Sequence, residues 1–152
     1  MLLDVLGPRV EWVPVCPEVE VGMGTPREPI HLVASADGVP SGGERVRLVG
    51  VQSREDWTAS MEAWAAKRAR ELVELKLSGY ILKKDSPSCG PHAVPVRHGE
   101  RTTRTGRGLF AQALTDVLPN LPVEDEARLQ DASIREAFIA RVFAYDRFRS
   151  SG

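Results

Sequence analysis

Cysteine is scarce in this chain of 152 residues, which contains two, Cys16 and Cys89. There are 72 residues between them and neither belongs to a Cys-x-x-Cys pair, so a disulfide framework, a zinc ribbon and a thioredoxin-like site are all disfavoured. In a reducing compartment, a thiol pair of this kind is more often metal-binding or reactive. The two cysteines are therefore candidates for chemistry rather than for cross-linking.

Long apolar runs and a strong net charge are also missing. No apolar run approaches the length of a membrane span, and residues 1–5 are too short and too acidic a start for a signal peptide. The formal net charge of −1 offers no general attraction for nucleic acid or an anionic membrane, although a local patch is compatible with it. We therefore expect a cytoplasmic protein that binds neither nucleic acid nor membrane.

The chain has the size and apolar content of one globular domain, and strand and helix patterns alternate along it. The patterns predict the tail of a helix at 1–9, strands at 10–15, 30–33, 45–51, 80–83 and 121–123, and helices at 53–77, 108–118 and 132–148. Residues 30–51 form an exposed β-hairpin in this interpretation, whereas the basic tract 98–107 is expected to be a mobile loop.

The strand at 80–83 is apolar on both faces, which is typical of a buried parallel strand. Together with the alternation of elements, it predicts an α/β layered fold with a mainly parallel sheet flanked by helices, plus the β-hairpin as an excursion. Ser53 is the expected cap of the first long helix, and Asp131 or Ser133 that of the last.

Each cysteine follows one of the predicted strands. Cys89 lies in Ser86-Pro87-Ser88-Cys89-Gly90 after the strand at 80–83, and Cys16 follows the strand at 10–15. Open α/β folds bind their ligands at the carboxyl edge of the sheet, where such loops lie. A lone cysteine is more often a small buried hydrophobe, but the Pro, Ser, Gly and Glu neighbours here do not build an apolar pocket. Both thiols are therefore predicted to be presented on loops.

Other polar residues are weaker candidates. Arg27, in the glycine-rich loop 16–29, could bind an anion together with backbone N–H groups, or the loop could be a structural connection, with about even weight for each. The arginines and threonines of 98–107 could likewise hold an anion, although a solvated loop is favoured. His92 and His98 are possible ligands or bases but fit ordinary loop histidines better.

Several motifs together resemble one known family. They are Val-Pro-Val-Cys-Pro-Glu-Val at 13–19, Gly-x-Gly-Thr-Pro-Arg-x-Pro at 22–29, Gly-Tyr-Ile-Leu-Lys at 79–83, Ser-Pro-Ser-Cys-Gly at 86–90 and Gly-x-Gly-x-Phe-Ala at 106–111. The chain is similar in these motifs to the uncharacterised-domain family that includes the 2-thiouracil desulfurases. The likeness runs through Arg141-Val142-Phe143-Ala144-Tyr145 and so covers nearly the whole chain. It implies a single desulfurase-like domain over 1–152, incomplete at its N-terminus relative to the family.

The resemblance implies a [4Fe-4S] cluster held by three cysteines, with one iron open to substrate. Cys16 and Cys89 match two of these ligands. The third lies in a Cys-Leu-Leu-Gly segment at the end of the family's first strand, and this sequence does not contain it. Two thiolates are poor support for a four-iron cluster. The cluster then requires another chain, a non-cysteine ligand or a further N-terminal segment, and otherwise the chain is cluster-free and inactive.

The resemblance also implies an activity. The open iron would polarise a C=S bond, water would attack the carbon, and sulfide would leave. Glu18 and Ser86 are the expected proton-handling residues, with Ser86 equally compatible with a turn-stabilising role, and Arg27 and Ser88 are candidates for binding the substrate or an anion.

The expected function is a desulfurase that removes sulfur from a thiolated nucleobase or similar thiocarbonyl compound, its partner being a small thio-substrate. The alternative is a non-catalytic, cluster-free domain of the same fold that binds a partner or a small anion. A thiol redox pair is a third possibility if the two sulfurs approach each other. A homodimer is compatible with each of these.

Overall fold

The computed structural model of the chain describes residues 10–35 and 45–151. The predicted helix tail at 1–9 and most of the predicted hairpin tip lie outside these residues. Among the described helices, none is both long and apolar enough to cross a membrane.

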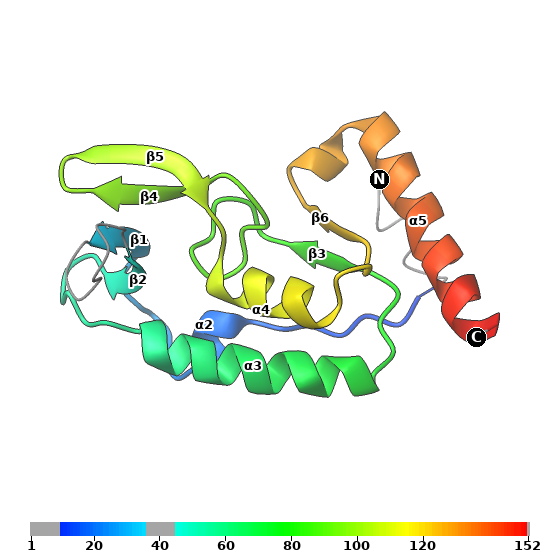
Figure 1. Cartoon of the computed structure of the whole chain (residues 1–152), viewed down its shortest axis with the longest axis horizontal. Helices are drawn as coiled ribbons and strands as arrows, with labels where there is room; N and C mark the ends of the chain where they lie inside the picture. Colours follow the sequence, from blue (N-terminus) through cyan, green and yellow to red (C-terminus); the bar gives the residue numbers. More distant parts are fainter. Residues whose placement is uncertain (1–9, 36–44, 152) are drawn as a thin grey trace.

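One sheet contains four strands in the order β2-β1-β4-β5 (Figure 1). Strand β1 (Ile30–Ser35) pairs antiparallel with β2 (Arg45–Gly50) on one side and parallel with β4 (Val94–His98) on the other. Strand β5 (Arg101–Gly106) pairs antiparallel with β4 and forms the edge. Leu48 and Val96 are the register partners of Leu32 on the two neighbouring strands, so the three side chains lie on the same face of the sheet. There they pack against Met61.

The second sheet is a parallel pair, β3 (Tyr80–Leu82) and β6 (Val123–Asp125). Leu82 packs into the same cluster as Phe110, whereas Ile81 packs against Phe138 of the last helix. The two faces of β3 are thus covered by different helices, which makes this half of the molecule a three-layer arrangement. The edge of β3 away from β6 has no partner strand among the described residues.

Helix α3 (Thr58–Glu74) joins the two halves, because Met61 packs under the four-stranded sheet and Leu72 packs in the cluster around β3 (Figure 1). Helix α4 (Leu109–Val117) lies between α3 and the β3–β6 pair, and α5 (Ala132–Ser151) covers the opposite face. The remaining short elements are α2 (Pro17–Glu20) and a 3-10 turn, η2 (Arg128–Gln130).

The α/β layered class is confirmed, as are the hairpin and the strand that begins at Tyr80. The sheets are less parallel than predicted, since β1–β4 and β3–β6 are parallel and β1–β2 and β4–β5 are antiparallel. The hairpin is also no excursion, because β1 is an inner strand of the four-stranded sheet.

Two predicted elements are wrong. Residues 10–15 form no strand, and Trp12 and Val13 are exposed. Pro14 offers no backbone donor, and no strand among the described residues pairs with the segment. The tract 98–107 is not a loop but contributes the end of β4 and all of β5. Its threonines favour a strand, and Gly99, with φ of 64°, allows the tight turn.

The helix caps also differ from the prediction in part. Ser53 lies in a turn before α3, and it is Asp56 whose carboxylate accepts the Thr58 N–H at 2.9 Å. At the last helix Asp131 is the cap, because its carboxylate accepts the N–H groups of Ser133 and Ile134 at 2.8 and 3.3 Å. The alternative cap, Ser133, instead donates its hydroxyl to Asp131.

Candidate functional site

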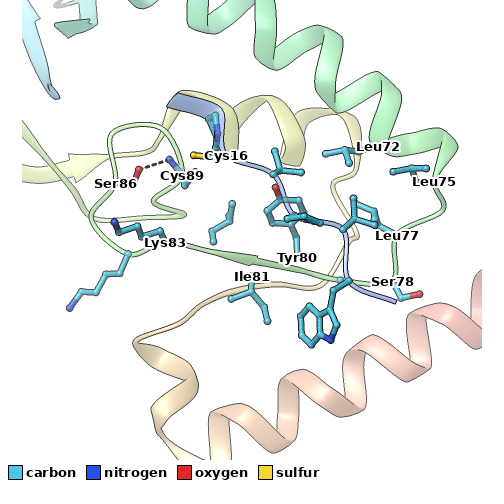
Figure 2. A pocket seen from close by; sticks show the side chains of 18 of the residues that line it. Cys16, Leu72, Leu75, Leu77, Ser78, Tyr80, Ile81, Lys83, Ser86 and Cys89 are labelled. Atoms are coloured by element: carbon cyan, nitrogen blue, oxygen red, sulfur yellow. Dashed lines mark hydrogen bonds between the residues drawn. The ribbon is translucent and has the colours of Figure 1, made fainter. Parts of the chain in front are cut away.

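A groove with a volume of about 1260 Å³ contains both cysteines (Figure 2). Its walls are the segment 10–18, the strand β3 with the loop that follows it, the end of α3, and part of α5. The groove runs along the unpaired edge of β3, since β6 contributes no lining residue. Two cysteines with 72 residues between them in the sequence thus meet at one end of a single cavity.

The loop that carries Cys89 is held by the start of α4. The backbone N–H groups of Gly108, Leu109 and Phe110 donate to the carbonyl oxygens of Gly90, Pro87 and Ser88 at 2.8, 3.1 and 2.8 Å. These are the N–H groups that the first turn of a helix leaves without a partner in the helix itself, so the loop satisfies them. Gly108 permits this approach, because a Cβ there would lie 2.5 Å from the Cys89 nitrogen.

Ser86 closes the same loop. Its hydroxyl oxygen accepts the N–H groups of Ser88 and Cys89 at 3.2 and 3.0 Å, and its carbonyl oxygen accepts the N–H of Gly90 at 2.8 Å. The turn-stabilising role that the sequence allowed is therefore present. A proton-handling role remains compatible with it, because the hydroxyl hydrogen is not used by these two bonds.

Cys16 ends the extended segment and begins the short helix α2. Pro17 occupies the first helical position, where its missing N–H is harmless. The Cys16 N–H donates to the Glu20 carboxylate at 3.0 Å, and the Cys16 carbonyl oxygen accepts the Glu20 N–H at 2.9 Å. Glu20 in turn lies 3.2 Å from the guanidinium of Arg68 on α3. Cys16 itself is exposed.

Glu18 connects the two cysteine loops. One of its carboxylate oxygens accepts from Nε of Arg27 at 2.8 Å and lies 2.8 Å from another guanidinium nitrogen of the same arginine. The other oxygen accepts the hydroxyl of Ser88 at 3.2 Å, and Ser88 is fully buried in the Cys89 loop. The carboxylate thus has a fixed position beside the groove, held by a charged donor on one side and a neutral donor on the other.

Burial dominates the electrostatics of Cys89. It raises the pKa of the thiol to about 12, and the charges of Glu18 and Cys16 act in the same direction. A hydrogen bond from Ser86 and the charge of Lys83 oppose the rise. At neutral pH the isolated thiol is therefore protonated.

Most of the predicted site residues line this groove. Cys16, Cys89, Glu18, Ser86 and Arg27 all contribute to it. Ser88 does not line the groove, because it is fully buried and its hydroxyl donates to Glu18, and its role in binding a substrate or an anion stays a prediction. The guanidinium of Arg27 is engaged by Glu18 and by the carbonyl oxygen of Gly24, so a further role in binding an anion stays a prediction.

The structure adds residues that the sequence did not indicate. Tyr80 lines the groove beside the cysteines, and Glu20 holds the Cys16 backbone. Tyr80 was interpreted as part of a buried strand, and no local pattern distinguishes a core tyrosine from one whose hydroxyl reaches a cavity. The histidines His92 and His98 and the tract 101–107 do not line the groove.

The metal-ligating side chains in this groove do not fit a complete four-iron cluster. The chain has two cysteines, and across residues 10–35 and 45–151 there is no group of three or more His, Cys, Asp or Glu side chains that could hold a metal ion. Protein [4Fe-4S] clusters are held by more thiolates than this. Cys16 and Cys89 therefore form part of such a site at most.

Comparisons with known proteins agree with the motifs. The uncharacterised protein YbbK of Bacillus subtilis is 37% identical over 103 residues, which are 67% of this chain and 66% of YbbK, so the match spans just under two thirds of that relative. A solved structure, the [4Fe-4S]-dependent thiouracil desulfidase TudS, matches with a TM-score of 0.58 and 24% identity over 89% of this chain and 80% of TudS. This likeness shows that the two proteins share a fold. The family model of 2-thiouracil desulfurase matches residues 1–126, so the chain belongs to the 2-thiouracil desulfurase family.

Proposed function

We propose that this chain forms the substrate groove and the proton-handling part of a desulfurase that replaces the sulfur of a thiocarbonyl compound, such as a thiolated nucleobase, with oxygen. Family and fold support a desulfurase-like function. The observation that carries the proposal is the meeting of Cys16, Cys89 and Glu18 at one end of an open groove.

The reaction consumes one water and releases one sulfide. Water adds to the thiocarbonyl carbon, the C–S bond breaks, and a C=O bond remains, so that two protons must move from the water to the sulfide. Glu18 is the base on this side of the groove, because its carboxylate is held by Arg27 and Ser88 and lies next to both cysteine loops. Ser86, whose oxygen already accepts two N–H groups, can donate its hydroxyl hydrogen toward the Cys89 side.

The number of thiolate ligands available to a cluster decides which form of the protein is active. We expect this chain of 152 residues to hold no stable four-iron cluster by itself, since it offers two thiolates. The free edge of β3 borders the groove, so an additional strand pairing there would reach the cysteine loops. A form of the protein in which such a segment adds a third cysteine is therefore the form expected to desulfurise.

Anaerobic reconstitution with iron and sulfide, followed by iron counting and a visible spectrum, tests this. The chain alone should retain no four-iron cluster. A form extended by a cysteine-bearing segment should retain about four irons per chain and convert 2-thiouracil to uracil and sulfide. The matched control is the same extended form with Cys16→Ala, which should lose iron. A fully loaded extended form that releases no sulfide from any thiolated base would contradict the proposed function.

A second candidate function follows from the same number of thiolate ligands. A chain with two thiols and an intact groove could bind a small anion or a partner without catalysis, and this is favoured if the extended form also retains no iron. The predicted cytoplasmic location, the lack of nucleic-acid and membrane partners, and the homodimer stay predictions, each open to fractionation or light scattering.

A further inference from the structure

We infer that the hydroxyl of Tyr80 is a substrate-recognition group, which donates a hydrogen bond to a ring oxygen of the base bound in the groove. The inference rests on the proposed function and adds a specificity-determining residue to it.

The first observation is the fixed position of the Tyr80 ring. Tyr80 is the first residue of β3, and its ring contacts that of Phe110 with centroids 5.8 Å apart and planes tilted by 57°. Phe110 is fully buried and contacts Trp64 of α3 at 5.1 Å. Because the ring is held by buried aromatic neighbours, the hydroxyl points in one direction rather than sampling several.

The second observation is where the hydroxyl points. Figure 2 shows Tyr80 in the groove with its oxygen directed toward the segment that carries Cys16. Tyr80 lines the same groove as Cys16 and Cys89.

The third observation is that this donor is not used by the protein. Tyr80 is half-buried, and in the part of the chain that the structure describes its hydroxyl makes no hydrogen bond, so the donor is available to a ligand in the groove. A tyrosine hydroxyl is protonated at neutral pH without any help from its surroundings. The group is therefore an O–H donor that lines the cavity.

The chemistry of a pyrimidine base fits such a donor. A thiolated uracil has a carbonyl oxygen on the ring in addition to its sulfur, and oxygen accepts hydrogen bonds better than sulfur. A base whose sulfur faces the cysteines offers the remaining ring edge to the nearby wall of the groove, where Tyr80 lies. A site built to hydrogen-bond a substrate group discriminates strongly against an analogue without that group, because its own donor is then left unpaired.

The test compares two ligands and three proteins. Binding of 2-thiouracil, which has the ring oxygen, and of 2-thiopyrimidine, which lacks it, is measured by ligand-observed NMR titration with the wild-type chain, Tyr80→Phe and Tyr145→Phe. Tyr145 is the other tyrosine of the chain and does not line the groove, so its variant is the matched control for loss of a hydroxyl. Thermal unfolding of each protein provides a readout of folding that is independent of ligand.

We expect Tyr80→Phe to weaken the binding of 2-thiouracil by about 2- to 13-fold, the range for one net hydrogen bond. Binding of 2-thiopyrimidine and the melting temperature should not change, because the hydroxyl makes no bond in the folded chain. Equal affinity of Tyr80→Phe and wild type for 2-thiouracil would overturn the inference and leave the proposed function intact. Failure of the wild-type chain to bind either ligand would also overturn the inference, whereas the proposed function is decided separately, by sulfide release from the iron-loaded extended form.

Discussion

Replacing Gly108 by alanine should separate the first turn of α4 from the Cys89 loop. The backbone of Gly108, with φ of −58° and ψ of 142°, suits any residue, so without a clash the change would stabilise the fold by about 0.4–1 kcal/mol. A Cβ at this position, however, would lie 2.5 Å from the Cys89 nitrogen and the Ser88 oxygen, and closer still to the Ser88 carbonyl carbon. All three are backbone atoms, which cannot rotate away as a side-chain tip can.

The expected cost follows from what must move. Overpacking of a close contact costs about 1–3 kcal/mol. Three backbone hydrogen bonds join residues 108–110 to the loop, and each contributes about 1 kcal/mol, so partial loss of them adds to the cost. We therefore expect Gly108→Ala to lower the free energy of unfolding by about 2–5 kcal/mol.

Urea unfolding followed by tryptophan fluorescence measures this loss, and the rate at which Cys89 reacts with a thiol reagent reports on the loop. The control is Gly99→Ala, in the β4–β5 turn, where no atom lies within 4 Å of the added Cβ but φ is 64°. That variant should cost about 1–2 kcal/mol through backbone strain alone and leave Cys89 unchanged. If Gly108→Ala were as stable as wild type with an unchanged thiol rate, the close approach of α4 and the Cys89 loop would be refuted.

Three further predictions follow from the thiols and the helix cap. The exposed Cys16 should react with an alkylating reagent at neutral pH at least about tenfold faster than Cys89, because burial keeps the Cys89 thiol protonated. Mass spectrometry of the two cysteine-containing peptides measures the ratio of the two rates. Equal rates would contradict the burial of Cys89. The Cys89 thiol titrates near pH 9 when unfolded and near 12 when folded, so the folded state binds more protons between these values and stability should fall as pH rises from about 9, by at most about 1.4 kcal/mol per pH unit. Urea midpoints from pH 8 to 10.5 measure this, and Cys89→Ser should flatten the slope. Asp131→Ala removes the acceptor for two N–H groups of α5 and should cost about 1 kcal/mol, whereas Ser133→Ala, which removes a donor to the cap, should cost less.

The sequence predicted the site better than it predicted the sheet. The Pro, Ser and Gly residues beside each thiol predicted correctly that both cysteines lie outside helices and strands, which is a local property. They also suggested that neither thiol meets an apolar environment, and this is wrong for Cys89, which packs against the apolar cluster around Phe110. The segment 10–15 was predicted as a strand from its apolar residues, yet a strand exists only where another strand pairs with it, and that depends on distant residues. The tract 98–107 shows the opposite error, since its three arginines suggested a solvated loop, whereas its threonines lie in a strand that pairs with β4.

Partners within the site were the least predictable feature. Arg27 was considered as an anion-binding residue because an arginine in a glycine-rich loop has that appearance in sequence, but its guanidinium pairs with Glu18, nine residues away. Ser88 is a candidate for binding the substrate or an anion, but its hydroxyl donates to Glu18, 70 residues away, and the sequence did not indicate this pair. Such pairs depend on how the loops pack, and neither spacing nor composition encodes that.

The position of Cys89 is determined by α4 more than by its own loop. Within the loop, Ser86 provides the only side-chain oxygen that accepts the described backbone N–H groups, whereas three N–H groups of α4 fix the loop from outside. The first turn of α4 is also where Phe110 begins the aromatic contacts that hold Tyr80. One helix start therefore positions both the thiol and the hydroxyl that we assign to substrate recognition. A change such as Gly108→Ala should consequently alter Cys89 reactivity and 2-thiouracil affinity together, whereas Tyr80→Phe should alter affinity and leave the thiol unchanged.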